Sequence, residues 1–98
     1  MKIGGIGTID TITLLRLAGV KYCAVAEDVS TQFDEIAKDV DILIIDYETA
    51  EKIRDKILYF RLMHDKPVIV EIPGKKGKEM EDTIRKIIVR AVGVDIGD

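Results

Sequence analysis

Two short runs of consecutive apolar residues constrain the fold of this chain more than any other feature. One run covers residues 42–45 (ILII) and the other covers residues 68–70 (VIV). A strand with one face in water alternates apolar and polar residues, whereas a strand that is covered on both faces is apolar throughout. The two runs therefore predict strands of a parallel sheet that has helices on both of its faces.

Strand and helix signals alternate along the whole chain, with short connections between them. Strands are expected at 1–6, 22–26, 41–46 and 68–72, and helices at 10–18, 29–38, 48–63 and 79–92. This alternation is typical of strand–helix units joined by right-handed crossovers. We expect an α/β fold: a small three-layer, doubly wound sandwich with a four-stranded parallel sheet in the order 2-1-3-4, similar to receiver domains and flavodoxins. Residues 1–78 would form the α/β core, and residues 79–98 the C-terminal helix and tail of the same single domain.

The composition limits the classes of function that the chain can perform. Its 98 residues are enough for one domain. A hydrophobic fraction of 47% with 34% charged residues predicts a globular chain rather than a disordered one. A net charge of −3 without a basic arm argues against nucleic acid as a partner. Because no run approaches the roughly 18 apolar residues of a membrane span, we also expect no direct insertion into a membrane.

Few residues offer catalytic or metal-binding chemistry. Cys23 and His64 are the only cysteine and the only histidine, and a redox or metal role would require a second such residue. The loop after the last predicted strand, residues 71–77 (EIPGKKG), has no His, Cys or Ser to act as a nucleophile or a general base. We therefore expect no catalytic residue, no cofactor and no metal site.

Two sites of small-molecule chemistry remain as hypotheses. Gly5 and Gly7 match the start of a dinucleotide-binding loop, but Asp10 stands in place of the third glycine and would repel a pyrophosphate. Asp46 closes the third predicted strand, where receiver domains carry the aspartate that takes up a phosphoryl group. A simpler role for Asp46 is the N-cap of the next helix, in which case Asp46→Asn should cost less than about 1 kcal/mol of stability.

The last predicted helix has more apolar surface than one core stripe requires. An amphipathic helix buries one stripe, which here consists of Met80, Ile84, Ile87, Ile88 and Ala91. Val89 and Val92 fall outside that stripe, and a similar excess occurs near the end of the preceding helix at Tyr59, Leu62 and Met63. The end of the last strand also presents a loop at the edge of the sheet. We predict a protein-docking surface formed by Glu71, Ile72, Pro73, Gly74, Arg85, Val89, Arg90 and Val92.

Two sequence blocks resemble a known family across nearly the full length of the chain. Residues 7–20 (GTIDTITLLRLAGV) are similar to the family opening Gly-Asp-Glu-Asp-Thr-Val-x-Gly-Phe-x-Leu-Ala-Gly, and residues 67–74 (PVIVEIPG) to its Pro-x-x-x-Glu-Ile-Pro-Ser/Gly block. Residues 49–54 (TAEKIR) also resemble the start of its third helix. The chain thus resembles the F subunits of the archaeal and vacuolar-type (A-type and V-type) rotary ATPases. It departs from the first block at Thr8, Ile9, Leu14 and Leu15.

The resemblance implies a non-catalytic component of the central rotor stalk. Such a component binds the coiled coil of the D subunit of the ATPase and takes part in coupling ATP synthesis or hydrolysis to transport of protons or sodium ions. Contacts with the catalytic head and with the protein that joins the rotor to the membrane are also implied. The complex would place this chain at the cytoplasmic face of the cell membrane, as a peripheral part.

An alternative from another class stays open at this point. A chain with this predicted fold could be a stand-alone receiver-like or flavodoxin-like module for signalling or small-ligand binding. Binding of FMN, or uptake of a phosphoryl group in the presence of magnesium, would favour the module. A stoichiometric complex with the coiled coil of a D subunit would favour the stalk component.

Overall fold

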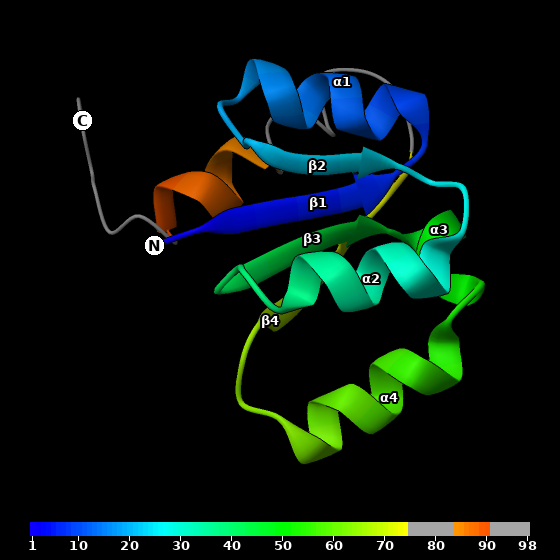
Figure 1. The fold of residues 1–98 in the computed structure, drawn as a ribbon. Helices are drawn as coiled ribbons and strands as arrows, with labels where there is room; N and C mark the ends of the chain where they lie inside the picture. Colours follow the sequence, from blue (N-terminus) through cyan, green and yellow to red (C-terminus); the bar gives the residue numbers. More distant parts are fainter. Residues whose placement is uncertain (75–83, 91–98) are drawn as a thin grey trace.

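Four strands form one parallel sheet in the computed structural model, which describes residues 1–74 and 84–90 (Figure 1). The strands are β1 (Ile3–Gly7), β2 (Tyr22–Val25), β3 (Ile42–Asp46) and β4 (Val68–Ile72). Their order is β2-β1-β3-β4 and every neighbouring pair is parallel. The predicted fold class and strand order are therefore confirmed.

Helices cover both faces of this sheet. They are α1 (Ile9–Leu17), α2 (Val29–Ala37), α3 (Tyr47–Glu51) and α4 (Arg54–Met63), together with a helical segment over residues 84–90. Figure 1 shows α1 and the orange helix 84–90 on one side of the sheet, and α2 and α4 on the other. The predicted residues 79–83 and 91–92 of the last helix lie outside the described residues.

The core consists of two apolar clusters separated by the sheet. Because successive side chains of a strand point to opposite faces, the apolar run of β3 serves both clusters. Leu43 and Ile45 face α2 and α4 in a cluster that includes Phe33, Ile57 and Ile69. Ile44 faces the opposite way, toward α1 and helix 84–90, in a cluster that includes Ile12, Leu15, Ile72 and Ile84. This double coverage explains why β3 has no polar residue before Asp46.

The third predicted helix, 48–63, is wrong as a single element. The structure has two helices there, α3 and α4, separated at Lys52 and Ile53. The N–H groups of these two residues donate to the carbonyls of Thr49 and Ala50, three residues back, which tightens the last turn of α3. Ile53 then leaves the helical region with φ −131° and ψ 35°. The change of direction keeps Ala50, Ile53 and Ile57 all in the same cluster.

The glycines of β1 allow α1 and β3 to approach this strand closely. A Cβ on Gly7 would lie 2.5 Å from Oδ2 of Asp46 and 2.9 Å from Cγ2 of Thr11, which is closer than real Cβ contacts permit. A Cβ on Gly5 would overlap Cδ1 of Leu15. Packing within the protein thus accounts for the glycine pattern that sequence alone related to dinucleotide binding.

We expect Gly7→Ala to destabilise the fold by about 1–3 kcal/mol, because the added methyl group must displace Asp46 or Thr11. The matched control is Gly74→Ala, whose Cβ would lie 3.6 Å from Cβ of Asp46, an ordinary contact; its effect should stay within about 0.5 kcal/mol. Urea unfolding of both variants measures the difference. Equal unfolding midpoints for Gly7→Ala and the unmodified chain would contradict this packing argument.

Candidate functional site

Asp46 joins three elements at the carboxyl edge of the sheet, where the strands end. Its Oδ2 accepts hydrogen bonds from the backbone N–H of Thr8 at 2.8 Å and from the hydroxyl of Thr11 at 2.7 Å. Its Oδ1 accepts from the N–H of Thr49 at 2.9 Å, which makes Asp46 the N-cap of α3. The residue is fully buried. The predicted N-cap role is confirmed, and the structure adds the bonds to Thr8 and Thr11.

These bonds fix the charge of Asp46 and argue against a phosphoacceptor role. Burial opposes ionisation of this carboxyl group, but the hydrogen bonds from Thr49, Thr11 and Thr8 outweigh it and hold the pKa of Asp46 below its ordinary value. A phosphoacceptor needs an oxygen that a phosphoryl donor can reach. Here both oxygens are occupied by internal donors, and the side chain is out of contact with solvent.

Glu71 is held by two arginines of α4. Arg54 donates to both carboxylate oxygens of Glu71, at 2.6 and 2.8 Å, and Nη1 of Arg61 lies 3.3 Å from Oε2. Arg54 also donates to Glu51 of α3. The Glu71 side chain is only 14% exposed. Its hydrogen bonds from Arg54 and the charges of both arginines hold the pKa of Glu71 below its ordinary value, and the pKa of Arg54 is raised in turn.

The other three residues of the predicted loop differ in how accessible they are. Ile72 is buried in the same apolar cluster as Ile84, whereas Pro73 is half-buried and Gly74 is exposed. Successive residues of β4 point to opposite faces, so Glu71 faces α4 while Ile72 faces helix 84–90. The structure therefore does not bring Glu71 together with the described part of the last helix, residues 84–90.

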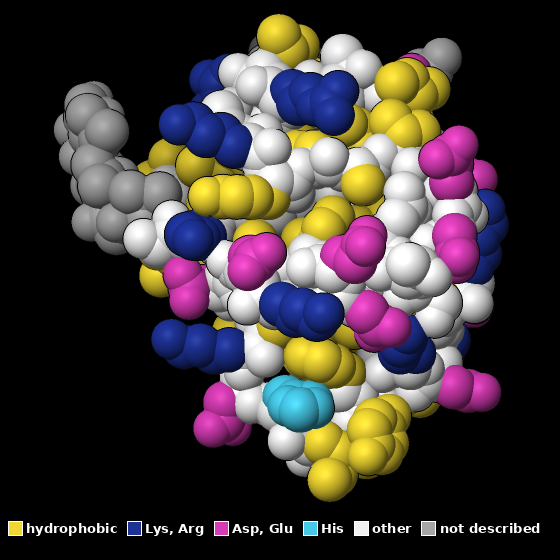
Figure 2. Space-filling model, in the orientation of Figure 1, with side chains coloured by type: hydrophobic (Ala, Val, Ile, Leu, Met, Phe, Trp, Pro, Cys, Tyr) yellow, Lys and Arg dark blue, Asp and Glu magenta, His cyan; other side chains and the backbone are white. Residues whose placement is uncertain are grey.

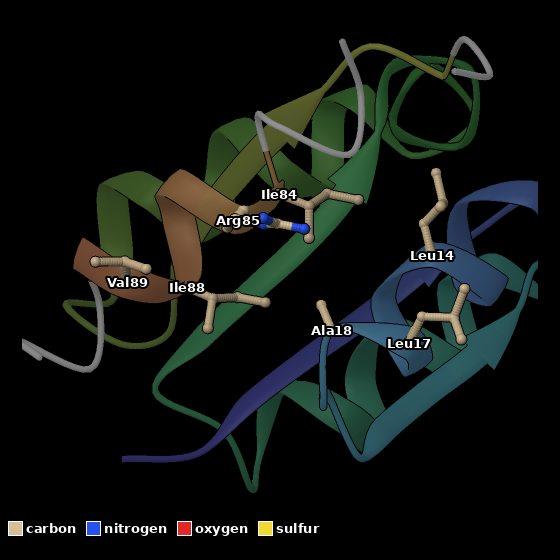
Figure 3. Close-up of a pocket in the computed structure, with 7 residues that line it drawn as sticks. All are labelled: Leu14, Leu17, Ala18, Ile84, Arg85, Ile88 and Val89. Atoms are coloured by element: carbon tan, nitrogen blue, oxygen red, sulfur yellow. The ribbon is translucent and has the colours of Figure 1, made fainter. Parts of the chain in front are cut away.

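A cleft of about 270 Å³ lies between α1 and helix 84–90 (Figure 3). Figure 3 shows the two walls: one helix supplies Ile84, Arg85, Ile88 and Val89, and the other side is formed by Leu14 and Leu17 of α1 and by Ala18 directly after it. Six of these seven side chains are apolar. Val89 is 44% exposed and Leu17 is 80% exposed, so the apolar lining continues onto the surface.

The cleft contains two of the predicted docking residues, Arg85 and Val89. Arg90 is exposed on the same helix, and Val92 lies outside the described residues. The contribution of α1 was missed by sequence reasoning. The sequence signal for it is the group of three leucines, Leu14, Leu15 and Leu17, because one core stripe cannot bury all of them. In the structure, Leu15 is the one of the three that is fully buried.

Cys23 and His64, the remaining candidate residues, both make contacts within the fold. Cys23 is half-buried, its thiol donates to the carbonyl of Val20 at 3.4 Å, and burial raises its pKa. His64 stacks on Phe60 with ring centroids 4.4 Å apart. Within residues 1–74 and 84–90, no group of three His, Cys, Asp or Glu side chains could hold a metal ion. No helix among these residues is long and apolar enough to cross a membrane.

This fold and this site define a small, doubly wound α/β domain with exposed apolar helix surfaces and a cleft between two helices. The chain belongs to the ATP synthase (F/14-kDa) subunit family, whose model matches residues 3–88. The resemblance found in the two sequence blocks is thereby confirmed.

Individual relatives match along the whole chain, and each is named as the F subunit of an A-type ATP synthase. The chain is 36% identical over 102 residues to the protein of Methanocaldococcus jannaschii, and 36% identical over 103 residues to that of Methanococcus maripaludis. It is 31% identical over 106 residues to the protein of Thermococcus kodakarensis. Each match covers 98% of this chain and 98–99% of the relative.

The Asp46 network predicts a larger effect of Asp46→Asn than a simple cap would. An amide presents one acceptor and one donor group, so its NH₂ must face an N–H or hydroxyl donor at one of the two oxygen positions. We expect a loss of about 1–3 kcal/mol, measured by urea unfolding. Asp28→Asn is the matched control, because Asp28 caps α2 at an exposed position by accepting from Thr31. A loss from Asp46→Asn no larger than that of the control would reject the network.

The ion pairs of Glu71 with Arg54 and Arg61 predict that stability depends on the charge of Glu71, and therefore on pH. A carboxyl group whose pKa is lowered by folding stabilises the fold above its ordinary pKa, and the contribution disappears as the pH falls through the folded-state pKa. We expect Glu71→Gln to cost about 1–3 kcal/mol near neutral pH and to show a flatter decline of stability toward pH ~3. Urea midpoints measured against pH test this. Parallel curves for the two proteins would contradict the assignment.

Proposed function

We propose that this chain is a non-catalytic component of the central stalk, the rotor, of an archaeal A-type ATP synthase. In this role it binds the coiled coil of the D subunit and helps couple ATP synthesis or hydrolysis to the transport of protons or sodium ions. The observation that carries the proposal is the family match over residues 3–88, together with relatives of the same name that align end to end.

The surroundings of the strand ends support a binding role over a catalytic one. In receiver domains and flavodoxins, chemistry takes place at the carboxyl edge of the sheet. Here Asp46 and Glu71, at the ends of β3 and β4, both have internal partners. We therefore favour the stalk component over the receiver-like or flavodoxin-like module.

We place the docking surface for the D subunit on helix 84–90 and the adjoining cleft. Val89 and Leu17 offer exposed apolar area, and Arg85 and Arg90 lie beside it. A coiled coil presents ridges of apolar and charged side chains, which a shallow apolar cleft with basic residues at its margin can receive. Pro73 and Gly74 extend this proposed surface, and Glu71 supports it indirectly by fixing the end of β4.

The rest of the proposal concerns the assembled complex. The catalytic head and the protein that joins the rotor to the membrane are proposed as further neighbours. In such an assembly, the chain would be a peripheral component at the cytoplasmic face of the cell membrane.

The double variant Val89→Asp/Arg90→Glu tests the docking surface. Both side chains are exposed, so the fold should persist, while binding to the D-subunit coiled coil of an archaeal A-type ATP synthase should weaken by about 1–3 kcal/mol. Circular dichroism and a calorimetric titration measure the two quantities.

The contrasting variant is Ile84→Asp, at a side chain only 1% exposed, which should detach the helix from the sheet because it buries a charge without a partner. Full binding by the folded double variant would show that the docking surface does not include Val89 and Arg90. The module hypothesis would be favoured if the chain formed no complex with the coiled coil and instead bound FMN or took up a phosphoryl group from acetyl phosphate.

A further inference from the structure

The outer surface of α4 carries a second group of exposed apolar side chains. We call it the α4 stripe; its members are Leu58, Tyr59, Leu62 and Met63, with exposed fractions between 50% and 84%. Residues four apart lie one above the other on a helix, so Leu58 with Leu62 and Tyr59 with Met63 form one continuous strip. Figure 2 shows hydrophobic side chains gathered over α4 beside the histidine.

The apolar clusters formed by residues 1–74 and 84–90 do not include this strip. The inner side of α4 supplies Ile57, which is fully buried, and Phe60, which packs edge-on against Phe33 of α2. Two further contacts tie the helix to its neighbours: Lys56 pairs with Asp34 of α2, and the arginines hold Glu71 of β4. With α4 anchored in this way, four large apolar side chains on its outer side remain for another molecule.

The side of the strip toward β4 is basic. Of the five Lys or Arg in residues 51–66, Arg54 and Lys56 are paired with Glu71 and Asp34. Toward β4 the bases reach solvent further than their acidic partners do. The side chains of Arg61 and Lys66 are 42% and 75% exposed, whereas those of Glu71 and Asp41 are 14% and 35% exposed. We call Arg61 and Lys66 the basic margin of the α4 stripe.

The basic margin decides between two occupants. An antiparallel two-fold pair of α4 helices would set Arg61 of each copy, near the middle of the stripe, beside Arg61 of the other, and such a like-charge contact is costly. A helix with carboxylates along one side of an apolar ridge would instead match both the strip and its margin. The charge distribution thus favours a different protein over a second copy of this chain.

The β4 edge beside the strip does not favour an added strand as the occupant. The N–H of Val68 donates to the carbonyl of Asp41, toward β3. Because the backbone groups of successive strand residues point in alternate directions, the carbonyl of Ile69 points outward at the open edge. Arg61 donates to that carbonyl at 2.8 Å, so its side chain stands where a partner strand would pair.

The opposite edge of the sheet is arranged in the same way. The N–H of Ala26 donates to the carbonyl of Gly7, and therefore the carbonyl of Val25 in β2 points outward. Gln32 donates to it at 2.9 Å and accepts from the N–H of Glu27 at 3.0 Å. With a side chain on each open edge, docking by helix faces fits this molecule better than docking by strand addition.

We propose that the α4 stripe binds an amphipathic helix of another protein in the same complex, with Asp or Glu of that helix facing the basic margin. The α4 stripe and helix 84–90 lie on opposite faces of the sheet. The domain would then lie between two partner helices, one on each face of its sheet. This inference rests on the proposed function for the complex in which the partner is found, but it uses a different surface.

The test is site-specific cross-linking within the assembled A-type ATP synthase. A photoreactive benzoylphenylalanine is placed at Tyr59, at Leu62, at Val89 or, as a control on the exposed end of α2, at Lys38. We expect positions 59 and 62 to cross-link to an acidic-flanked helix of another protein of the complex, position 89 to a different segment, and position 38 to neither.

Two variants test the chemistry of the contact. Leu62→Asp should lower the yield of the position-59 cross-link at least tenfold, and Lys66→Glu should lower it several-fold, with a weaker response to salt. Lys38→Glu changes the net charge more than Leu62→Asp does, yet it should leave the yield unchanged. Urea unfolding verifies that each variant is folded, as expected from exposures of 84% at Leu62 and 75% at Lys66.

The outcomes separate this inference from the proposed function. A cross-link from position 62 to a second copy of this chain, or none while position 89 reacts, overturns the α4 stripe as a helix site and leaves the stalk role intact. Failure of the chain to enter the complex at all overturns the proposed function instead.

Discussion

The carboxylate of Asp46 is the point on which the geometry of the strand ends depends. It accepts hydrogen bonds from the first N–H after β1, from a hydroxyl of α1 and from an N–H in the first turn of α3. A buried carboxylate is tolerated only when hydrogen bonds replace its lost hydration. These bonds also require β1 to lie close to β3, which only a residue without a side chain permits at Gly7. One buried charge thus fixes where two helices begin.

The sheet could be predicted from the sequence because its signals are local and agree with one another. The apolar run of residues 42–45 indicates a strand covered on both faces, and Asp46 directly after it is a strong N-cap residue. The division of the next helix could not be predicted in the same way. Residues 48–63 favour helix throughout, and the break at Ile53 arises from burial of Ile53 together with Ala50 and Ile57, which is a tertiary effect.

The candidate site was predictable in its residue types but not in their grouping. Glu71 was expected beside the last helix, yet the two-residue period of β4 turns it toward α4, where Arg54 and Arg61 bind it. That period was visible in the sequence, but the face that each helix covers was not. Pairing of Glu71 with α4, and of Leu17 with Val89 across a cleft, depends on the handedness and order of the crossovers. Such contacts emerge only when all layers are placed.

Gln32 and Arg61, which lie on the open edges of the sheet, affect how readily the isolated chain can pair with other strands. An open parallel sheet with bare outer strands is a template on which further chains can add and grow into fibres. At each edge here, a side chain from a neighbouring helix donates to a carbonyl that points outward. A copy of the chain outside the complex is therefore less open to strand addition, and loss of Gln32 or Arg61 would leave an outward carbonyl free to pair with another strand.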